Sequence, residues 1–166
     1  MDTIYVETTV VGSLAGRMHP DPLIAARQTA TRKWWKSASQ KYRLLISELV
    51  IDECNAGDPT AAAERLAVIN GIDLLDASED VENLADALVS HQAVPRSQPR
   101  DAFHIAIAAV HGIQYIVTWN FKHILNPTLQ HRIAAVCRDC GFEPPVICTP
   151  EQLLEAADDE HDSDAD

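Results

Sequence analysis

Three carboxylates and one amide in this sequence have the types and positions needed for shared chemistry. Glu7 and Asn120 each end a run of β-branched and aromatic residues, and Asp101 lies in the first turn of an apolar helical segment. Glu53 falls on the apolar side of another helical segment. A carboxylate that faces the interior is costly unless it is paired with a base or binds a cation. Oxygen ligands gathered without Cys or His are those that Mg²⁺ and Mn²⁺ prefer.

These four side chains can act together only if the fold brings their segments to one place. Patterns of apolar residues and capping residues predict the elements. The expected strands cover residues 3–7, 43–46, 72–75, 114–120 and 145–148, and the expected helices cover residues 22–36, 48–56, 60–69, 79–92, 99–111 and 128–140. Strands that alternate with helices favour an α/β fold with a parallel sheet covered on both faces. Ligands bind such sheets at the carboxyl ends of the strands, where Glu7 and Asn120 are expected.

Length and charge set limits on the organisation of the chain. The 166 residues, 46% of them hydrophobic, suffice for one domain with its own core, expected over residues 1–155. Residues 156–166 are acidic and of low complexity and are expected to be disordered. The net charge of −12 disfavours a nucleic-acid partner, but residues 1–43 carry seven Lys and Arg against three Asp and Glu. This basic end is either a solvated surface or a contact for an RNA backbone.

Cysteines and apolar runs bear on the location of the protein. Four cysteines without an N-terminal signal peptide favour the reducing cytoplasm over a disulfide framework. Cys137 and Cys140 have the spacing of half a zinc site, but no second pair accompanies them, so a structural role is expected. No apolar run approaches the roughly 18 residues of a membrane span, and no membrane contact is expected.

Four short segments carry the candidate residues in a recognisable order. They are Tyr5-Val6-Glu7-Thr8-Thr9, Ser47-Glu48-Leu49-Val50-Ile51-Asp52-Glu53, Arg100-Asp101-Ala102-Phe103-His104-Ile105-Ala106 and Thr118-Trp119-Asn120-Phe121-Lys122-His123. Together they resemble the four motifs of the PIN domain, as found in toxin ribonucleases of the VapC type. Their order and spacing carry the resemblance, which covers about residues 3–150.

The resemblance implies a three-layer α/β/α sandwich with a mainly parallel central sheet and Mg²⁺- or Mn²⁺-dependent cleavage of RNA. It also implies the toxin component of a type II toxin–antitoxin pair, with a cognate antitoxin as partner, and leaves a homodimer open. Glu7, Glu53 and Asp101 match the acidic positions of the family, Asn120 matches the fourth position, and Thr118 matches the hydroxyl position before it. Glu7 and Asp101 are the expected direct metal ligands, with Glu53 and Asn120 binding directly or through water. The expected reaction is metal-assisted hydrolysis of a phosphodiester.

Two departures from the family pattern leave an alternative open. Glu7 stands where the first motif usually has Asp, and Asn120 stands where the fourth often has Asp. The longer side chain reaches further and the amide brings no charge, so a second metal ion would be held less firmly. A PIN-like domain with weakened catalysis would then act as an RNA- or protein-binding module. A phosphoacceptor domain on a similar sheet is a further alternative, but the Asp and the strand-end Lys that it requires do not stand out.

Each candidate residue also has a purely structural interpretation. Asp101 could complement the dipole at the start of its helix. Glu53 could pair with Arg100 or another base. Glu7 and Asn120 could be polar residues at strand ends without any chemistry.

Two histidines and a tryptophan pair are expected to serve the core. His104 and His123 flank the candidate residues, but a His beside apolar residues is most often a buried group with satisfied hydrogen bonds. Trp34 and Trp35 are expected to pack inside, with a partner surface as the other interpretation.

Overall fold

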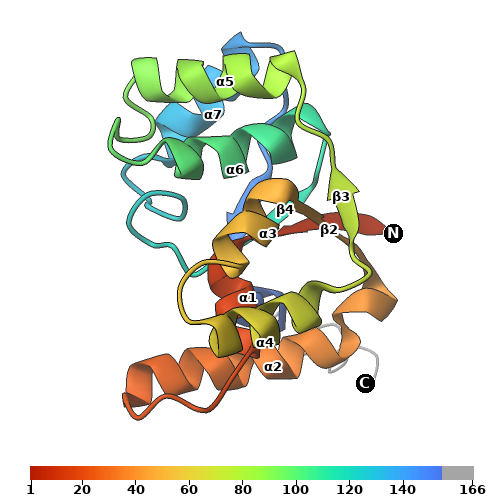
Figure 1. Cartoon of the computed structure of the whole chain (residues 1–166). Helices are drawn as coiled ribbons and strands as arrows, with labels where there is room; N and C mark the ends of the chain where they lie inside the picture. The colour runs from red at the N-terminus through yellow and green to blue at the C-terminus, as the bar shows by residue number, and fades with distance from the viewer. Residues whose placement is uncertain (155–166) are drawn as a thin grey trace, which may run out of the picture.

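The computed structural model describes residues 1–154 and is built around a five-stranded sheet with the strand order β3-β2-β1-β4-β5 (Figure 1). All the strand pairs are parallel. The strands are β1 (Asp2–Val6), β2 (Tyr42–Ser47), β3 (Asp73–Leu75), β4 (Tyr115–Val117) and β5 (Val146–Cys148). The disorder expected for residues 156–166 concerns a segment outside the described residues.

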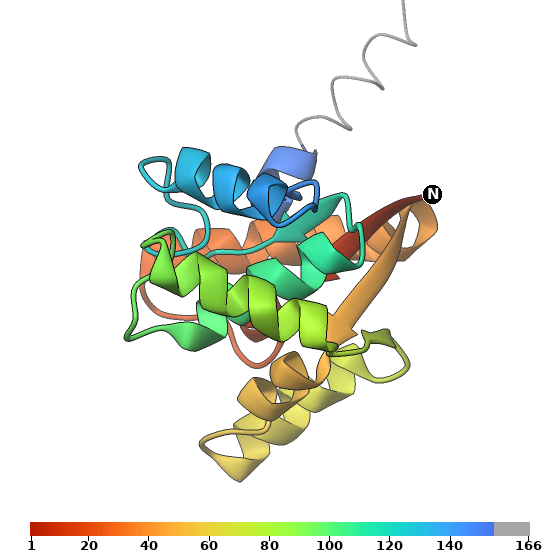
Figure 2. The ribbon, with the colours of Figure 1, turned by 90° about the horizontal axis from the view of Figure 1, so that it is seen from above.

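Helices cover both faces of this sheet and complete three layers. They are α1 (Thr8–Leu14), α2 (Pro22–Lys41), α3 (Glu48–Cys54), α4 (Pro59–Ile69), α5 (Glu79–Ser90), α6 (Pro99–Val110) and α7 (Gln130–Asp139). Helix α5 packs against α6 and α7, and α1 packs against α2 and α4. Figure 1 shows these two groups on opposite sides of the sheet, and Figure 2 looks down onto the group that contains α5. The predicted α/β/α sandwich with a parallel sheet is confirmed.

Strand β1 lies in the middle of the sheet, and the candidate site lies just beyond its carboxyl end. Its last three residues are fully buried, as expected for an inner strand of a parallel sheet. Tyr5 is in register with Leu45 of β2 and with Ile116 of β4, and Val6 is in register with Val117. Because β1 and β4 end at the same level, the residues that follow them meet at one edge.

The chain after β1 forms a helix where the sequence favours a turn. Glu7 is the N-cap of α1 rather than the last residue of a strand. β-Branched residues in α1 disfavour a helix, but two of its valines are fully buried, so tertiary packing overrides the local preference. Strand β4 is also shorter than expected and ends at Val117, three residues before Asn120. Glu7 and Asn120 therefore lie just beyond the strands, still at their carboxyl edge.

Helix α2 carries much of the basic charge and is longer than expected. Asp21 caps its start by accepting two backbone hydrogen bonds, with Pro22 at the first position. The helix was expected to end near Lys36 but continues to Lys41, because no Gly or Pro stops it and Ala38 extends its buried side. No helix in the described part of the chain, including this one of 20 residues, is long and apolar enough to cross a membrane.

One cluster of buried apolar side chains joins the sheet to both helix layers. Trp34 of α2 belongs to it with 3% of the residue exposed, and Trp35 packs against it, so the expected packing role of this pair is confirmed. Cys137 of α7 is also part of this core, where burial raises the pKa of its thiol to about 11.

Candidate functional site

Four of the five predicted site residues lie in one hydrogen-bond network at the carboxyl edge of β1 and β4. The Thr118 hydroxyl donates to Glu7 Oε2 at 2.8 Å and accepts a bond from the backbone N–H of Asn120 at 2.9 Å. The side-chain amide of Asn120 donates to Asp101 Oδ1 at 3.2 Å. Glu53, the fifth residue, contacts the first turn of α1. The structure thus brings together the segments that the sequence analysis expected to meet.

The Glu7 carboxylate is almost fully buried, with 3% of the residue exposed, and caps helix α1. Its Oε2 atom accepts hydrogen bonds from the Thr9 backbone N–H at 3.1 Å, from the Thr9 hydroxyl and from the Thr118 hydroxyl. Within residues 1–154, no protein donor bonds to Oε1, and no Lys or Arg forms an ion pair with this carboxylate. A buried carboxylate without a cation is costly. A bound cation would therefore stabilise Glu7.

Asp101 lies in the first turn of α6 with 9% of the residue exposed, and both of its carboxylate oxygens have partners. Oδ1 accepts the bond from Asn120, and Oδ2 lies 2.9 Å from His123 Nδ1. The His123 backbone N–H also donates to Asn120 Oδ1 at 3.1 Å. His123 therefore holds two candidate residues, a role that sequence reasoning missed. Its position three residues after Asn120 was the only signal.

Glu53 lies in the last turn of α3 with 21% of its side chain exposed. Its Oε1 accepts a hydrogen bond from the Thr8 hydroxyl at 2.8 Å and lies 2.6 Å from His104 Nε2. Burial by itself raises the pKa of Glu53, but the hydrogen bond and charge of His104 oppose it, helped by Thr8 and by the charge of Arg100. These contributions together hold the pKa of Glu53 below its usual value. The base that contacts Glu53 is therefore His104, and Arg100 acts only through its charge.

His104 is fully buried, as expected, and links Glu53 to the interior of the sheet. Its Nδ1 lies 2.6 Å from the Tyr5 hydroxyl, which lies 2.8 Å from the Ser47 hydroxyl. Burial raises the pKa of Tyr5 far above its usual value, so the phenol keeps its proton. In its neutral form, an imidazole with its proton on Nε2 donates to Glu53 and accepts at Nδ1 from Tyr5, which satisfies both contacts, whereas the charge contribution to Glu53 belongs to the protonated ring. The ring thus orients Glu53 from within the core.

The chemistry of the donor set suits a divalent cation. Three carboxylates and one amide supply only oxygen ligands, and the Lys and Arg side chains that form ion pairs in residues 1–154 do so elsewhere. Across the described chain, no group of three or more His, Cys, Asp and Glu side chains is spaced closely enough to hold a metal ion. Metal binding would require these carboxylates to exchange some of their protein hydrogen bonds for contacts with the ion.

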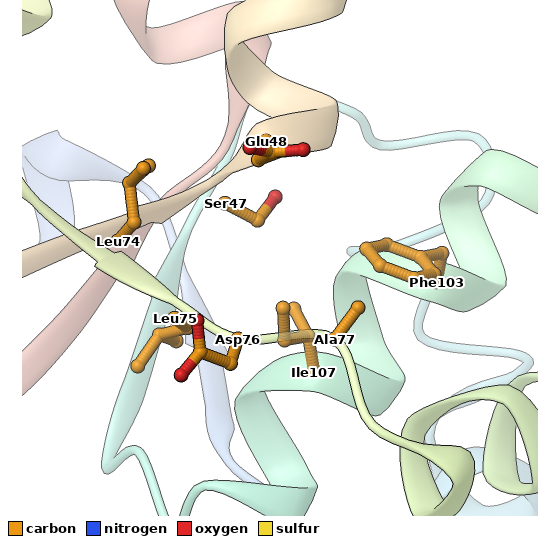
Figure 3. Close-up of a pocket in the computed structure, with 8 residues that line it drawn as sticks. All are labelled: Ser47, Glu48, Leu74, Leu75, Asp76, Ala77, Phe103 and Ile107. Carbon is orange, nitrogen blue, oxygen red and sulfur yellow. The ribbon is translucent and has the colours of Figure 1, made fainter.

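A cavity of about 390 Å³ lies at the same edge of the sheet, beside the ends of β2 and β3 (Figure 3). Its lining consists of Ser47, Glu48, Leu74, Leu75, Asp76, Ala77, Phe103 and Ile107. None of the five predicted site residues lines it. Its connection to the site is the Ser47 hydroxyl, which contacts Tyr5. This cavity is therefore separate from the carboxylate network.

The arrangement offers oxygen ligands to a cation only after its side chains rearrange, and among the described residues at this edge no nucleophile is activated. Cys54, whose charge would interact with those of Glu53 and Glu7, has its pKa raised to about 11 by burial, so its thiol is inert. The Ser47 hydroxyl contacts a tyrosine and not a general base. These properties are derived from this chain alone, because no family model, curated protein or solved structure matches it.

Proposed function

We propose that this protein is a metal-dependent ribonuclease of the PIN type that acts as the toxin of a toxin–antitoxin pair. One observation carries the proposal: Glu7, Glu53 and Asp101 reach one edge of a parallel sheet from three segments, and in the described part of the chain no Lys or Arg forms an ion pair with them. Histidines contact Glu53 and Asp101, but within residues 1–154 no basic side chain contacts the buried Glu7, and a hard cation would supply the charge that it lacks. The order of the motifs in the sequence agrees with this proposal.

Each side chain has its own task in this proposal. Glu7 and Asp101 hold Mg²⁺ or Mn²⁺, and Glu53 and the Asn120 side-chain oxygen complete the ligand set directly or through water. When bound, the ion supplies positive charge that polarises a phosphodiester for attack by water. Thr118, which contacts Glu7, orients a water molecule or a phosphate oxygen.

RNA is the proposed substrate, a cognate antitoxin is the proposed partner, and the cytoplasm is the proposed location. Five of the seven Lys and Arg of residues 1–43 lie on α2 and offer an RNA backbone a surface of opposite charge. The acidic remainder of the chain accounts for the net charge of −12. An antitoxin that covers the carboxylate edge would block access of RNA to the site.

The test is a cleavage assay on single-stranded RNA with the full chain, in Mn²⁺, in Mg²⁺ and in chelator. We expect cleavage only with a metal ion, and none from Asp101→Asn. Asp86→Asn changes an exposed carboxylate on α5 and is the matched control, which should cleave like the parent. Cleavage that survives chelation, or that Asp101→Asn leaves unchanged, would overturn the proposal.

A second function, RNA or protein binding without catalysis, is favoured by the partners of Asp101. Both of its oxygens are already satisfied by Asn120 and His123, so the site is stable without an ion. The two functions differ in the response of the melting temperature to Mn²⁺. A nuclease is stabilised by the ion that it binds, by about 2.7 kcal/mol at 100 times the dissociation constant. A binding module would bind RNA in chelator, cleave none of it with Mn²⁺, and melt at the same temperature with and without the ion.

A further inference from the structure

The segment 118–121 presents alternate side chains to two different environments. Thr118 and Asn120 bond to the carboxylate network, as described above. The other two residues of the segment, Trp119 and Phe121, instead lie against Arg27 of α2. Their ring centroids are 6.1 Å apart with a tilt of 58° between the ring planes. An aromatic surface therefore borders the candidate active site, one residue away from Asn120.

Trp119 is the fixed part of this surface. It is 9% exposed, and its indole N–H donates to the Thr31 hydroxyl of α2 at 2.9 Å. Its backbone N–H donates to the Thr9 hydroxyl at 2.9 Å, which ties it to the cap of α1. Phe121 is 43% exposed, so part of its ring is open to solvent. The pair thus combines an anchored ring with an accessible one.

Arg27 lies over both rings with its hydrogen-bond donors unused. Its guanidinium carbon is 5.6 Å from the centroid of Trp119 and 5.0 Å from that of Phe121, within the range of a cation–π contact. In the described part of the chain, no acceptor bonds to this guanidinium and no carboxylate pairs with it. A planar cation held on aromatic faces, with free donors, is suited to a phosphate group.

We propose that Phe121 and Arg27 form a subsite for one unpaired nucleotide of an RNA strand, which rests on the proposed function because it takes RNA as the ligand. The exposed ring of Phe121 stacks on the base, and Arg27 binds a phosphate of the same strand. The exposed Lys122 adds a second positive charge beside Phe121. Bases in a duplex already stack on both sides, so this subsite selects single-stranded RNA or a loop. It would hold the strand next to Asn120, with the scissile phosphate beyond it.

Exposed apolar residues on α2 make a protein partner the alternative occupant of this surface. Leu23 and Ile24 are 62% and 39% exposed and lie one turn before Arg27, so a protein partner could also cover this area. The free donors of Arg27 favour RNA, because an apolar protein contact would bury them without acceptors. Protein contact is therefore the alternative outcome of the test.

The experiment measures the affinity of the full chain for a fluorescently labelled single-stranded RNA in chelator, where no cleavage occurs. Phe121→Ala should weaken binding by about fivefold or more, since a stacked base contributes that much or more, and Phe121→Tyr should bind like the parent. Arg27→Ala should weaken binding and lower the slope of log affinity against log salt by about one. Arg138→Ala removes an exposed charge from α7, away from the basic surface of α2, and Leu74→Ala truncates a side chain on β3 that is 45% exposed. Both controls should stay within about twofold of the parent.

A second arm uses the RNA instead of the protein. An RNA with abasic positions should bind the parent less tightly, but it should bind Phe121→Ala no worse than the intact RNA does, because both changes remove the same stacking contact. Equal RNA affinities of the parent and Phe121→Ala would overturn the subsite. If the parent forms a dimer that Phe121→Ala does not form, the area would be assigned to protein contact instead.

The outcomes separate this inference from the ribonuclease proposal. Binding that depends on Phe121 without any cleavage in Mn²⁺ keeps the subsite and rejects the nuclease. Metal-dependent cleavage with unchanged affinity and KM in Phe121→Ala and Arg27→Ala keeps the nuclease and rejects the subsite.

Discussion

His123 Nδ1 lies 2.9 Å from Asp101 Oδ2, so the carboxylate at the start of the buried helix α6 is held by a side chain 22 residues later in the chain. The backbone N–H of the same His123 bonds to Asn120, which itself bonds to Asp101. These three residues form a closed set of contacts. Removing the imidazole would leave the Asp101 carboxylate with one partner in place of two.

His123→Ala should therefore reduce metal-dependent cleavage of RNA without unfolding the protein. Partners that orient metal ligands typically change activity by about 10- to 100-fold when removed. The measurement is kcat/KM in Mn²⁺, beside a thermal melt in chelator. His131→Ala, which changes an exposed imidazole on α7, is the control and should behave like the parent. Parent-like cleavage by His123→Ala would show that Asp101 does not depend on this contact.

Glu7→Gln should separate stability from activity. The amide keeps an oxygen that can accept the bonds from Thr9 and Thr118 but removes a buried charge that has no Lys or Arg partner in residues 1–154. We expect the free energy of unfolding in chelator to stay equal or rise, because a buried unpaired charge is costly. Cleavage and the stabilisation by Mn²⁺ should both be lost. A variant destabilised by more than about 1 kcal/mol that still responds to Mn²⁺ like the parent would assign Glu7 to helix capping alone.

The lowered pKa of Glu53 should make the free energy of unfolding fall at acidic pH. Its pKa in the folded protein is lowered, so over this range the unfolded chain binds more protons and stability rises with pH. The contribution of Glu53 is present above its unfolded pKa of about 4.3 and is lost as the pH falls through the lower folded value. Urea unfolding between pH 7 and pH 3 should give a shallower acid decline for Glu53→Gln than for the parent. Parallel curves for the two proteins would contradict this contribution.

Tyr5→Phe should destabilise the core although the aromatic ring is kept. The substitution removes the hydroxyl that lies between His104 Nδ1 and the Ser47 hydroxyl, all of them buried. A buried acceptor left without its donor costs about 1–3 kcal/mol, and the cost should appear in the midpoint of urea unfolding with an unchanged slope. Tyr115→Phe removes a hydroxyl for which the described residues provide no side-chain hydrogen bond, and it should cost less. A loss no larger in Tyr5→Phe than in Tyr115→Phe would show that the imidazole does not need this donor.

The sequence predicted most of the elements and the edge at which the candidate residues meet. Alternating strands and helices imply a parallel sheet, and the register of Val6 with Val117 confirms that Glu7 and Thr118 start from one level. Helix α1 could not be predicted, because its β-branched residues favour a strand or a turn and only burial makes them helical.

The side-chain partners could not be predicted, because they come from distant parts of the chain. His104 meets Tyr5, which is 99 residues away, and Arg27 meets Trp119 across the boundary between α2 and the end of β4. Periodicity shows which side of a helix faces the core but not which atom it will meet there. The roles of the histidines and of Arg27 therefore became visible only in three dimensions.

Because β1 lies at the centre of the sheet, the candidate site can assemble only after β4 has been synthesised. Strand β1 is made first, but its neighbour β4 ends only at Val117, and Asn120 follows Glu7 by 113 residues. At about 5 to 20 residues per second, a ribosome needs about 6 to 23 s to make that stretch. Until then the nascent chain lacks one side of the sheet, and Glu7 stays in water without Thr118 beside it. The ribosome that makes this chain therefore carries no assembled site until Asn120 has been added.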